Sequence, residues 1–92
     1  MALQKEITNG GRTGNYLRID RFDYIRSEPN RAYCDVGVYI NSAHAAVEGA
    51  VPLFKMGFAY QVAYDKESDV PALAQAYAGL MLHEDFQGAE HV

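Results

Sequence analysis

Histidine and carboxylate side chains, the residue types that bind metals or carry acid-base chemistry, gather near the C-terminal end of the chain. They are His83, Glu84, Asp85, Glu90 and His91. They lack the helical spacing of two histidines found in zinc proteases and the cysteine pairs of structural zinc sites. A histidine near the C-terminal end of a helix commonly interacts with the helix dipole, which explains His83 without a metal. We therefore expect no metal, no cofactor and no catalytic residue here.

Cys34 is the single cysteine, so it could act as a nucleophile but cannot form an internal disulfide. A nucleophilic thiol needs a nearby base or positive charge. Cys34 instead alternates with Val36 and Val38, where a free cysteine behaves as a small apolar side chain. The pattern predicts a core cysteine, and the lack of disulfides favours an intracellular origin.

The segment TNGGRTGN, residues 8–15, is rich in glycine like loops that bind phosphate. It lacks the lysine and serine that end a P-loop and the glycine spacing of a dinucleotide site. It also precedes a strand, whereas those motifs precede a helix. The segment therefore predicts a turn between two strands.

Tyrosine and arginine alternate with aspartate along residues 16–26 and 31–40, and the chain has seven tyrosines and no tryptophan. Interface cores are enriched in tyrosine and arginine. A solvated sheet face would carry the same residues, with cross-strand ion pairs of about 0.2 to 1 kcal/mol each. One helix cannot cover both faces of a sheet, so we favour an interface. Its predicted residues are Tyr16, Arg18, Tyr24, Arg26, Tyr33 and Tyr39.

Alternation of apolar and polar side chains predicts the strands. A slip in the pattern indicates either a bulge near Asp20 and Arg21 or a strand that is covered on both faces. The last strand is expected to be interrupted or bulged around Gly57. The short connection between the second and third strands predicts an antiparallel hairpin. The expected strands cover about residues 2–7, 16–26, 31–41 and 53–65.

The third expected strand has the most regular alternation, and its apolar face is predicted to form the core. The residues on that face are Cys34, Val36, Val38 and Ile40. After this strand, the alanines of residues 42–50 favour a helix, whereas Gly49 would end one. A short helix and a loosely ordered excursion both stay open for this segment.

Beyond residue 67 the apolar period changes from two to three or four. Ser68 or Asp69 is the expected N-cap and Pro71 lies in the first turn. The pattern predicts an amphipathic helix over about residues 70–83, with Phe86 returning to the core. The predicted fold is a single α+β domain, residues 1–92. It has a small antiparallel sheet of about four strands with the C-terminal amphipathic helix packed on one face.

The charge balance argues against two classes of partner. Twelve acidic and eight basic residues give a net charge of −4, which disfavours nucleic acid and anionic membranes.

Residues 1–10 have no apolar run of a signal peptide, and no segment approaches the roughly 18 apolar residues of a membrane span. Chains of this size bury only about 60% of their unfolded surface, so association with other chains would stabilise the fold.

Both ends of the chain resemble small proteins encoded in the structural gene clusters of tailed bacteriophages. MALQKEI, a turn of asparagine and glycine, and NYLRIDRF are similar to the opening of those proteins. AYAGLMLHEDFQGAEHV is similar to their closing helix and acidic tail. The likeness does not extend to the middle of the chain, and Leu17 replaces a histidine common in that group. The resemblance implies a virion component of the tail or baseplate region, made in the host cytoplasm, without catalytic residues.

The leading hypothesis is a non-enzymatic virion structural protein that contacts other virion proteins, in several copies or as a homo-oligomer. One alternative is a capsid decoration protein on the phage head. Another is a stand-alone intracellular module whose tyrosine-rich face binds a protein. An enzyme ranks last, because no spacing in the sequence places an acid and a base together.

Overall fold

The first two strands form a hairpin that turns at Gly10 and Gly11. The computed structural model describes residues 1–56 and 59–92. The φ angles of the two glycines are 59° and 79°, the left-handed values that a two-residue hairpin turn requires. The strands therefore reach the glycines, and the turn is shorter than the expected residues 8–15. In chain order the elements are β1 (Leu3–Asn9), β2 (Arg12–Tyr24), β3 (Arg31–Tyr39), α1 (Ser42–Ala46), β4 (Phe54–Lys55), β5 (Tyr60–Ala63), α2 (Ala72–Leu80), the 3₁₀ turn η1 (Glu84–Phe86) and β6 (Glu90–His91).

Strands β2 and β3 form the predicted antiparallel hairpin at the centre of the sheet. Ile19 lies opposite Val36, and Phe22 lies opposite Cys34. The register shifts between Ile19 and Arg21, so of the two readings of the pattern slip a bulge is present. Because the bulge inserts one residue, Ile19 and Phe22 stay on the same face although they are three positions apart.

Over residues 1–56 and 59–92 the sheet has six antiparallel strands where about four were expected, in the order β4–β3–β2–β1–β6, with β5 also paired to β3. The α+β class is confirmed. The expected fourth strand is two short strands, β4 and β5, which pair one after the other with the same edge of β3. The expected interruption at Gly57 lies outside the described residues.

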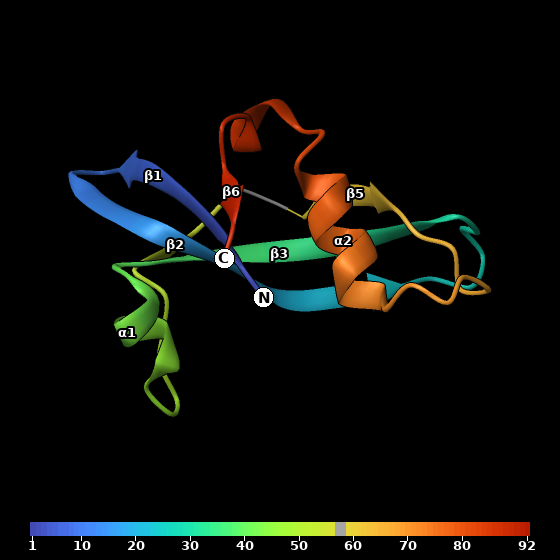
Figure 1. The fold of residues 1–92 in the computed structure, drawn as a ribbon, viewed down its shortest axis with the longest axis horizontal. Coiled ribbons are helices and arrows are strands. Elements are labelled where there is room, and N and C mark those ends of the chain that lie inside the picture. Colours follow the sequence, from blue (N-terminus) through green and yellow to red (C-terminus); the bar gives the residue numbers. More distant parts are fainter. Residues whose placement is uncertain (57–58) are drawn as a thin grey trace.

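Strand β6 brings the two ends of the chain together (Figure 1). Ala2 and Val92 exchange backbone hydrogen bonds with N to O distances of 3.2 and 3.0 Å. A strand of two residues has no alternation to detect, so the sequence pattern could not reveal it.

Helix α2 is shorter than expected at both ends. Pro71 is its N-cap residue and makes no side-chain capping bond. The hydroxyl of Ser68 accepts a hydrogen bond from the Val70 amide at 3.1 Å, so it closes the preceding turn and does not cap the helix. At the other end the His83 amide bonds to the Leu80 carbonyl at 2.9 Å, a three-residue spacing that tightens the chain out of the α-helix.

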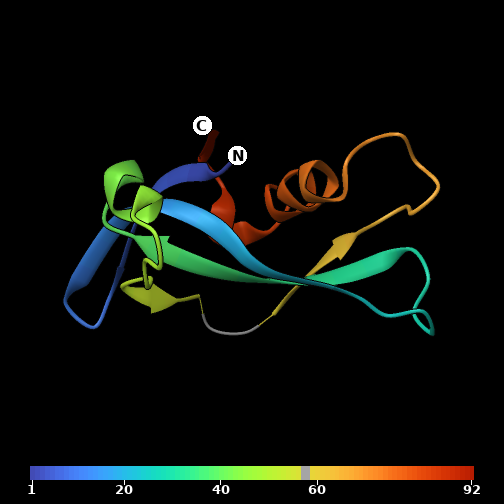
Figure 2. The same cartoon turned by 90° about the horizontal axis from the view of Figure 1, so that it is seen from below.

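The hydrophobic core includes side chains of the sheet and of α2, which lies along one side of the strands in Figure 2. Gly79 shows how close this approach is, because a Cβ added there would lie 2.7 Å from Cβ of Val62 in β5. The predicted return of Phe86 to the core is confirmed, since this side chain is fully buried. The core cluster consists of these buried residues: Leu3, Leu17, Ala32, Cys34, Val36, Val38, Tyr60, Val62, Ala76, Tyr77, Leu80, Phe86 and Ala89.

The core face of β3 ends at Val38, and the prediction that Ile40 faces the core is wrong. Val38 has no exposed surface, whereas Ile40 is 50% exposed. The Ile40 amide donates to Nδ1 of His44 at 3.1 Å, and the Asn41 side chain caps α1 by accepting from the His44 amide at 2.9 Å. The chain thus leaves the sheet after Tyr39. Of the two possibilities for residues 42–50, a short helix is present.

The burial difference between Val38 and Ile40 predicts opposite outcomes for the same substitution. Val38→Asp places a carboxylate in the core without a partner and should lower the free energy of unfolding by at least about 3 kcal/mol. Ile40→Asp, two residues further on, should change it by no more than about 0.5 kcal/mol. Thermal melting followed by circular dichroism measures both. Similar losses of stability in the two variants would contradict the burial of Val38 and the exposure of Ile40.

Candidate protein interface

Tyr39, Arg18 and Asp20 form a hydrogen-bonded cluster on the sheet face opposite the core. The Tyr39 side chain is fully buried, and its hydroxyl lies 2.9 Å from each carboxylate oxygen of Asp20, to which it donates. The same hydroxyl accepts from Nη2 of Arg18 at 2.6 Å, and Nε of Arg18 donates to Oδ1 of Asp20 at 3.0 Å. The guanidinium carbon lies 4.5 Å from the centre of the Tyr39 ring. Burial and the bond to Asp20 raise the pKa of Tyr39, which keeps the hydroxyl protonated.

Gly37 provides the space for this cluster. It lies opposite Arg18 in the sheet, and a Cβ at this position would overlap the carboxylate of Asp20. Any larger residue would displace that carboxylate from Tyr39. Sequence reasoning missed the cluster, although a glycine inside an otherwise regular strand is a known sign of a close approach.

Residues 41–53, which we call the arm, cover the cluster from outside. Nη1 of Arg18 donates to the Ala45 carbonyl at 3.1 Å, and the His44 ring packs edge-on against Tyr39 with centroids 5.3 Å apart. Arg12 donates to the Leu53 carbonyl at 2.9 Å at the far end of the arm. Figure 1 shows α1 on the opposite side of the strands from η1 and β6. Part of the predicted interface is therefore covered by the same chain.

The six residues predicted as an interface do not form one surface. Tyr39 and Arg18 belong to the cluster under the arm. Tyr24 lies on the α2 face of the sheet, because it pairs with the buried Ala32 and its ring packs edge-on against Tyr64 at 5.3 Å. The remaining three are partly or fully exposed: Tyr16, Arg26 and Tyr33.

A charged patch lies beyond the arm on the same face as Tyr33. Arg21 forms ion pairs with Asp23 and, at 3.4 Å, with Asp35. The Arg21 side chain is 67% exposed, and solvent-exposed ion pairs add little to stability. The fold therefore depends little on these pairs.

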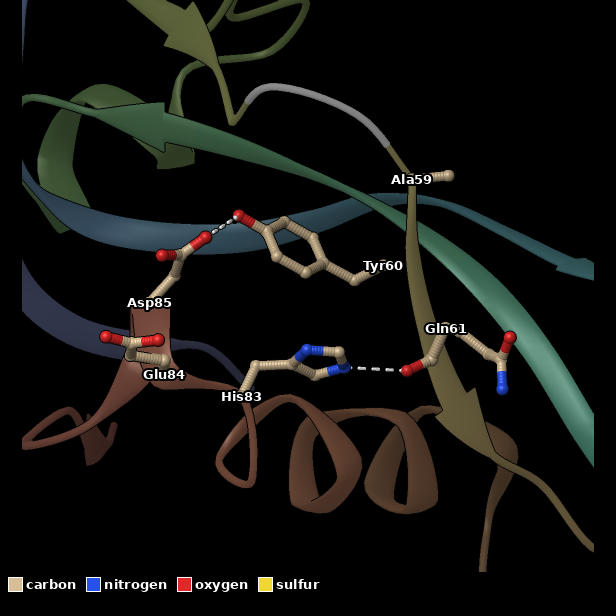
Figure 3. A pocket seen from close by; sticks show the side chains of 6 residues that line it. All are labelled: Ala59, Tyr60, Gln61, His83, Glu84 and Asp85. Atoms are coloured by element: carbon tan, nitrogen blue, oxygen red, sulfur yellow. Dashed lines mark hydrogen bonds between the residues drawn. The ribbon is translucent and has the colours of Figure 1, made fainter.

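A shallow pocket of about 410 Å³ lies where β5 meets the segment after α2. Figure 3 shows His83 and Tyr60 extending across it towards Gln61 and Asp85. Nε2 of His83 lies 2.7 Å from the Gln61 carbonyl, so this nitrogen carries the proton. The Tyr60 hydroxyl donates to Asp85 at 2.7 Å, and burial together with this bond raises the pKa of Tyr60. Both contacts attach β5 to the segment that follows α2, which is a structural role.

Within residues 1–56 and 59–92, no three histidine, cysteine or carboxylate side chains lie close enough to hold a metal ion. In that same part of the chain, no helix combines the length and the apolar character needed to cross a membrane.

The chain matches no known family model, and no similar protein was found among curated proteins or solved structures.

The Tyr39 hydroxyl should be worth more to stability than the Tyr33 hydroxyl. Tyr39→Phe leaves Arg18 and Asp20 without their shared buried partner and should cost about 1 to 3 kcal/mol. Tyr33→Phe is the matched control, because this hydroxyl donates to Glu28 at 2.8 Å from a partly exposed site. Its loss should cost no more than about 0.5 kcal/mol. Urea unfolding compares the two, and equal losses would argue against a buried cluster.

Cys34 should make stability fall at alkaline pH. Burial, with smaller contributions from Asp35 and Asp23, raises the pKa of this thiol from 9.0 to about 11. The unfolded chain ionises first, so the contribution is full below pH 9 and is lost as the pH rises through 11. Cys34→Ala should show a shallower decline in urea midpoint from pH 8 to 11, although buried tyrosines add a common decline. Parallel pH profiles would contradict this origin.

Proposed function

We propose that this protein is a non-enzymatic structural component of a tailed-phage particle, from its tail or baseplate region, and that it acts by assembling with other chains. The phage setting rests on the resemblance at the two ends of the sequence. The assembly role rests on one structural observation, the large apolar side chains that remain exposed along the arm.

The arm is held to the sheet by hydrogen bonds, but several of its apolar side chains are exposed. Its hydrogen bonds to Arg18 and Arg12 hold it against the sheet. Its outward side chains include Val47, which is 62% exposed, and Val51, which is 74% exposed, next to the half-exposed Ile40. Single exposed apolar residues are ordinary, but a group on one projecting segment is typical of a contact site. A neighbouring virion protein that covers this segment would gain the corresponding hydrophobic free energy.

The polar residues support assembly better than catalysis. His83, Asp85, Tyr60 and Asp20 are each held in a hydrogen bond that links two elements of the fold. In the proposed arrangement, α2 packs on one face of the sheet and the arm covers part of the other. The charged surface around Arg21 is left for further contacts.

Purified particles should contain several copies of this protein, as measured by quantitative mass spectrometry. Recovery only in the cytosol of infected cells would refute the proposal. Imaging that places its density on the head would replace the tail assignment with a decoration role.

A variant of the arm tests the contact itself. Val47→Asp with Val51→Asp should reduce incorporation into particles by about tenfold or more, because burying an unpaired carboxylate costs at least about 1.4 kcal/mol. The fold should be retained, since both side chains are exposed. Glu48→Gln is the control within the same arm and should be incorporated normally. Equal incorporation of the double variant would exclude the arm as the contact.

A further inference from the structure

The second half of β2 has one unpaired edge. On one side β2 pairs with β3 over residues 16–24, and on the other it pairs with β1 only over residues 12–17. Among the described strands, none pairs with residues 18–24 on that second side. An unpaired strand edge is where a strand of another chain can add to a sheet.

The neighbouring strands show which backbone groups of β2 point outward. The Val36 carbonyl accepts from the Met56 amide at 2.9 Å, on the side of β3 away from β2. Successive residues of a strand direct their N–H and C=O groups to opposite sides. Asp35 and, two residues earlier, Tyr33 therefore direct theirs towards β2.

The partners of these two residues in β2 are Arg21 and Asp23. Their backbone groups point towards β3, so the N–H and C=O groups of Phe22 and Tyr24 point to the open side. Earlier in the strand, the Ile19 amide also points away from β3, and it donates to the Tyr77 hydroxyl of α2 at 2.8 Å. The hydrogen bond to Tyr77 occupies the edge of β2 at residue 19. The open part of the edge begins after this residue.

The charged side chains beside this edge are complementary to the same side chains in a second copy of the chain. If two β2 strands pair antiparallel with Phe22 opposite Phe22, Arg21 of each copy lies opposite Asp23 of the other. Moving the two-fold axis by one residue would oppose Arg21 to Arg21 or Asp23 to Asp23, and like charges directly opposite are destabilising. One register therefore satisfies both the backbone and the charges.

Apolar side chains flank the edge on the other face of the sheet. Phe22 packs edge-on against Tyr64 on the α2 face, with centroids 5.3 Å apart. Leu73, one helical turn before Tyr77 on the same face of α2, is 48% exposed. A second copy would cover these side chains on one face and pair the charges on the other.

We propose that residues 20–24 of β2 pair antiparallel with the same segment of a second copy, and that this forms a two-fold dimer whose sheet is continuous through Phe22. This inference rests on the proposed assembly function and names a second copy of the chain as one partner. The arm remains available to other virion proteins.

Mixing two charge variants tests the register. Arg21→Glu opposes two acidic side chains across the dimer, and Asp23→Arg opposes two basic ones. Each variant alone should dimerise at least about tenfold more weakly than the parent protein by light scattering, a loss of about 1.4 kcal/mol. An equimolar mixture should restore the dimer, because both cross-strand pairs again have opposite charges. A role of these residues within one chain cannot respond to mixing, so a mixture that stays monomeric would overturn the proposal.

Arg31→Glu is the matched control, since it makes the same charge change at an exposed residue at the start of β3. It should leave the dimer intact, and its loss there would indicate an unspecific charge effect and contradict the proposed register.

Amide hydrogen exchange of the unaltered protein gives a second test that needs no variant. The Phe22 and Tyr24 amides should be protected at concentrations where the dimer forms and should exchange rapidly on dilution. Rapid exchange of both amides in a dimer would place the contact elsewhere.

The two proposals can fail separately. A protein that stays monomeric at every concentration but is present in several copies in particles would refute the edge pairing and keep the assembly function. A dimer that is restored by mixing the two variants, in a protein that is absent from particles, would support the edge pairing and refute the assembly function.

Discussion

The Tyr39 hydroxyl, held between the guanidinium of Arg18 and the carboxylate of Asp20, is the interaction on which the two-sided burial of β3 depends. One face of β3 packs into the core through Val36 and Val38, and this cluster covers the other face at Gly37 and Tyr39. The same Arg18 binds the arm through the Ala45 carbonyl, so the position of the arm depends on the cluster beneath it. A buried hydroxyl is costly without a partner, and Tyr39 obtains its partners from the partly exposed Arg18 and Asp20.

The abundance of tyrosine reflects this chemistry more than it reflects an exposed interface. Three of the seven tyrosines are buried, and each hydroxyl reaches a partner in another element: Asp20 for Tyr39, Asp85 for Tyr60 and the Ile19 amide for Tyr77. A tyrosine can bury its ring while its hydroxyl satisfies a polar group, which suits a small domain with little core volume. Residue type alone does not separate this use from binding, because the difference lies in which side chain covers the ring. That information is not local in sequence.

The features that the sequence predicted depend on local interactions, whereas the features that it missed depend on contacts between distant parts of the chain. The β2–β3 hairpin, its bulge, the core position of Cys34 and the return of Phe86 follow from alternation and short connections, which are local. Strand β6 depends on Ala2 meeting Val92, contacts from opposite ends of the chain. Ile40 was misplaced because the alternation of β3 continues in the letters after the strand has ended at α1.

The candidate site was predicted in part for the same reason. The exposure of Tyr16, Arg26 and Tyr33 agrees with a surface role, whereas Tyr39 and Arg18 are covered by an arm whose path the alanine-rich segment did not reveal. The bulge links the two surfaces of β2, since it places the Asp20 carboxylate near Gly37 and shifts the register just before Arg21 and Asp23. Charged side chains beside an open edge normally discourage strand addition by unrelated chains. In the proposed dimer, the alternation of Arg21 and Asp23 favours the same segment of a second copy, because antiparallel pairing places each basic residue opposite an acidic one.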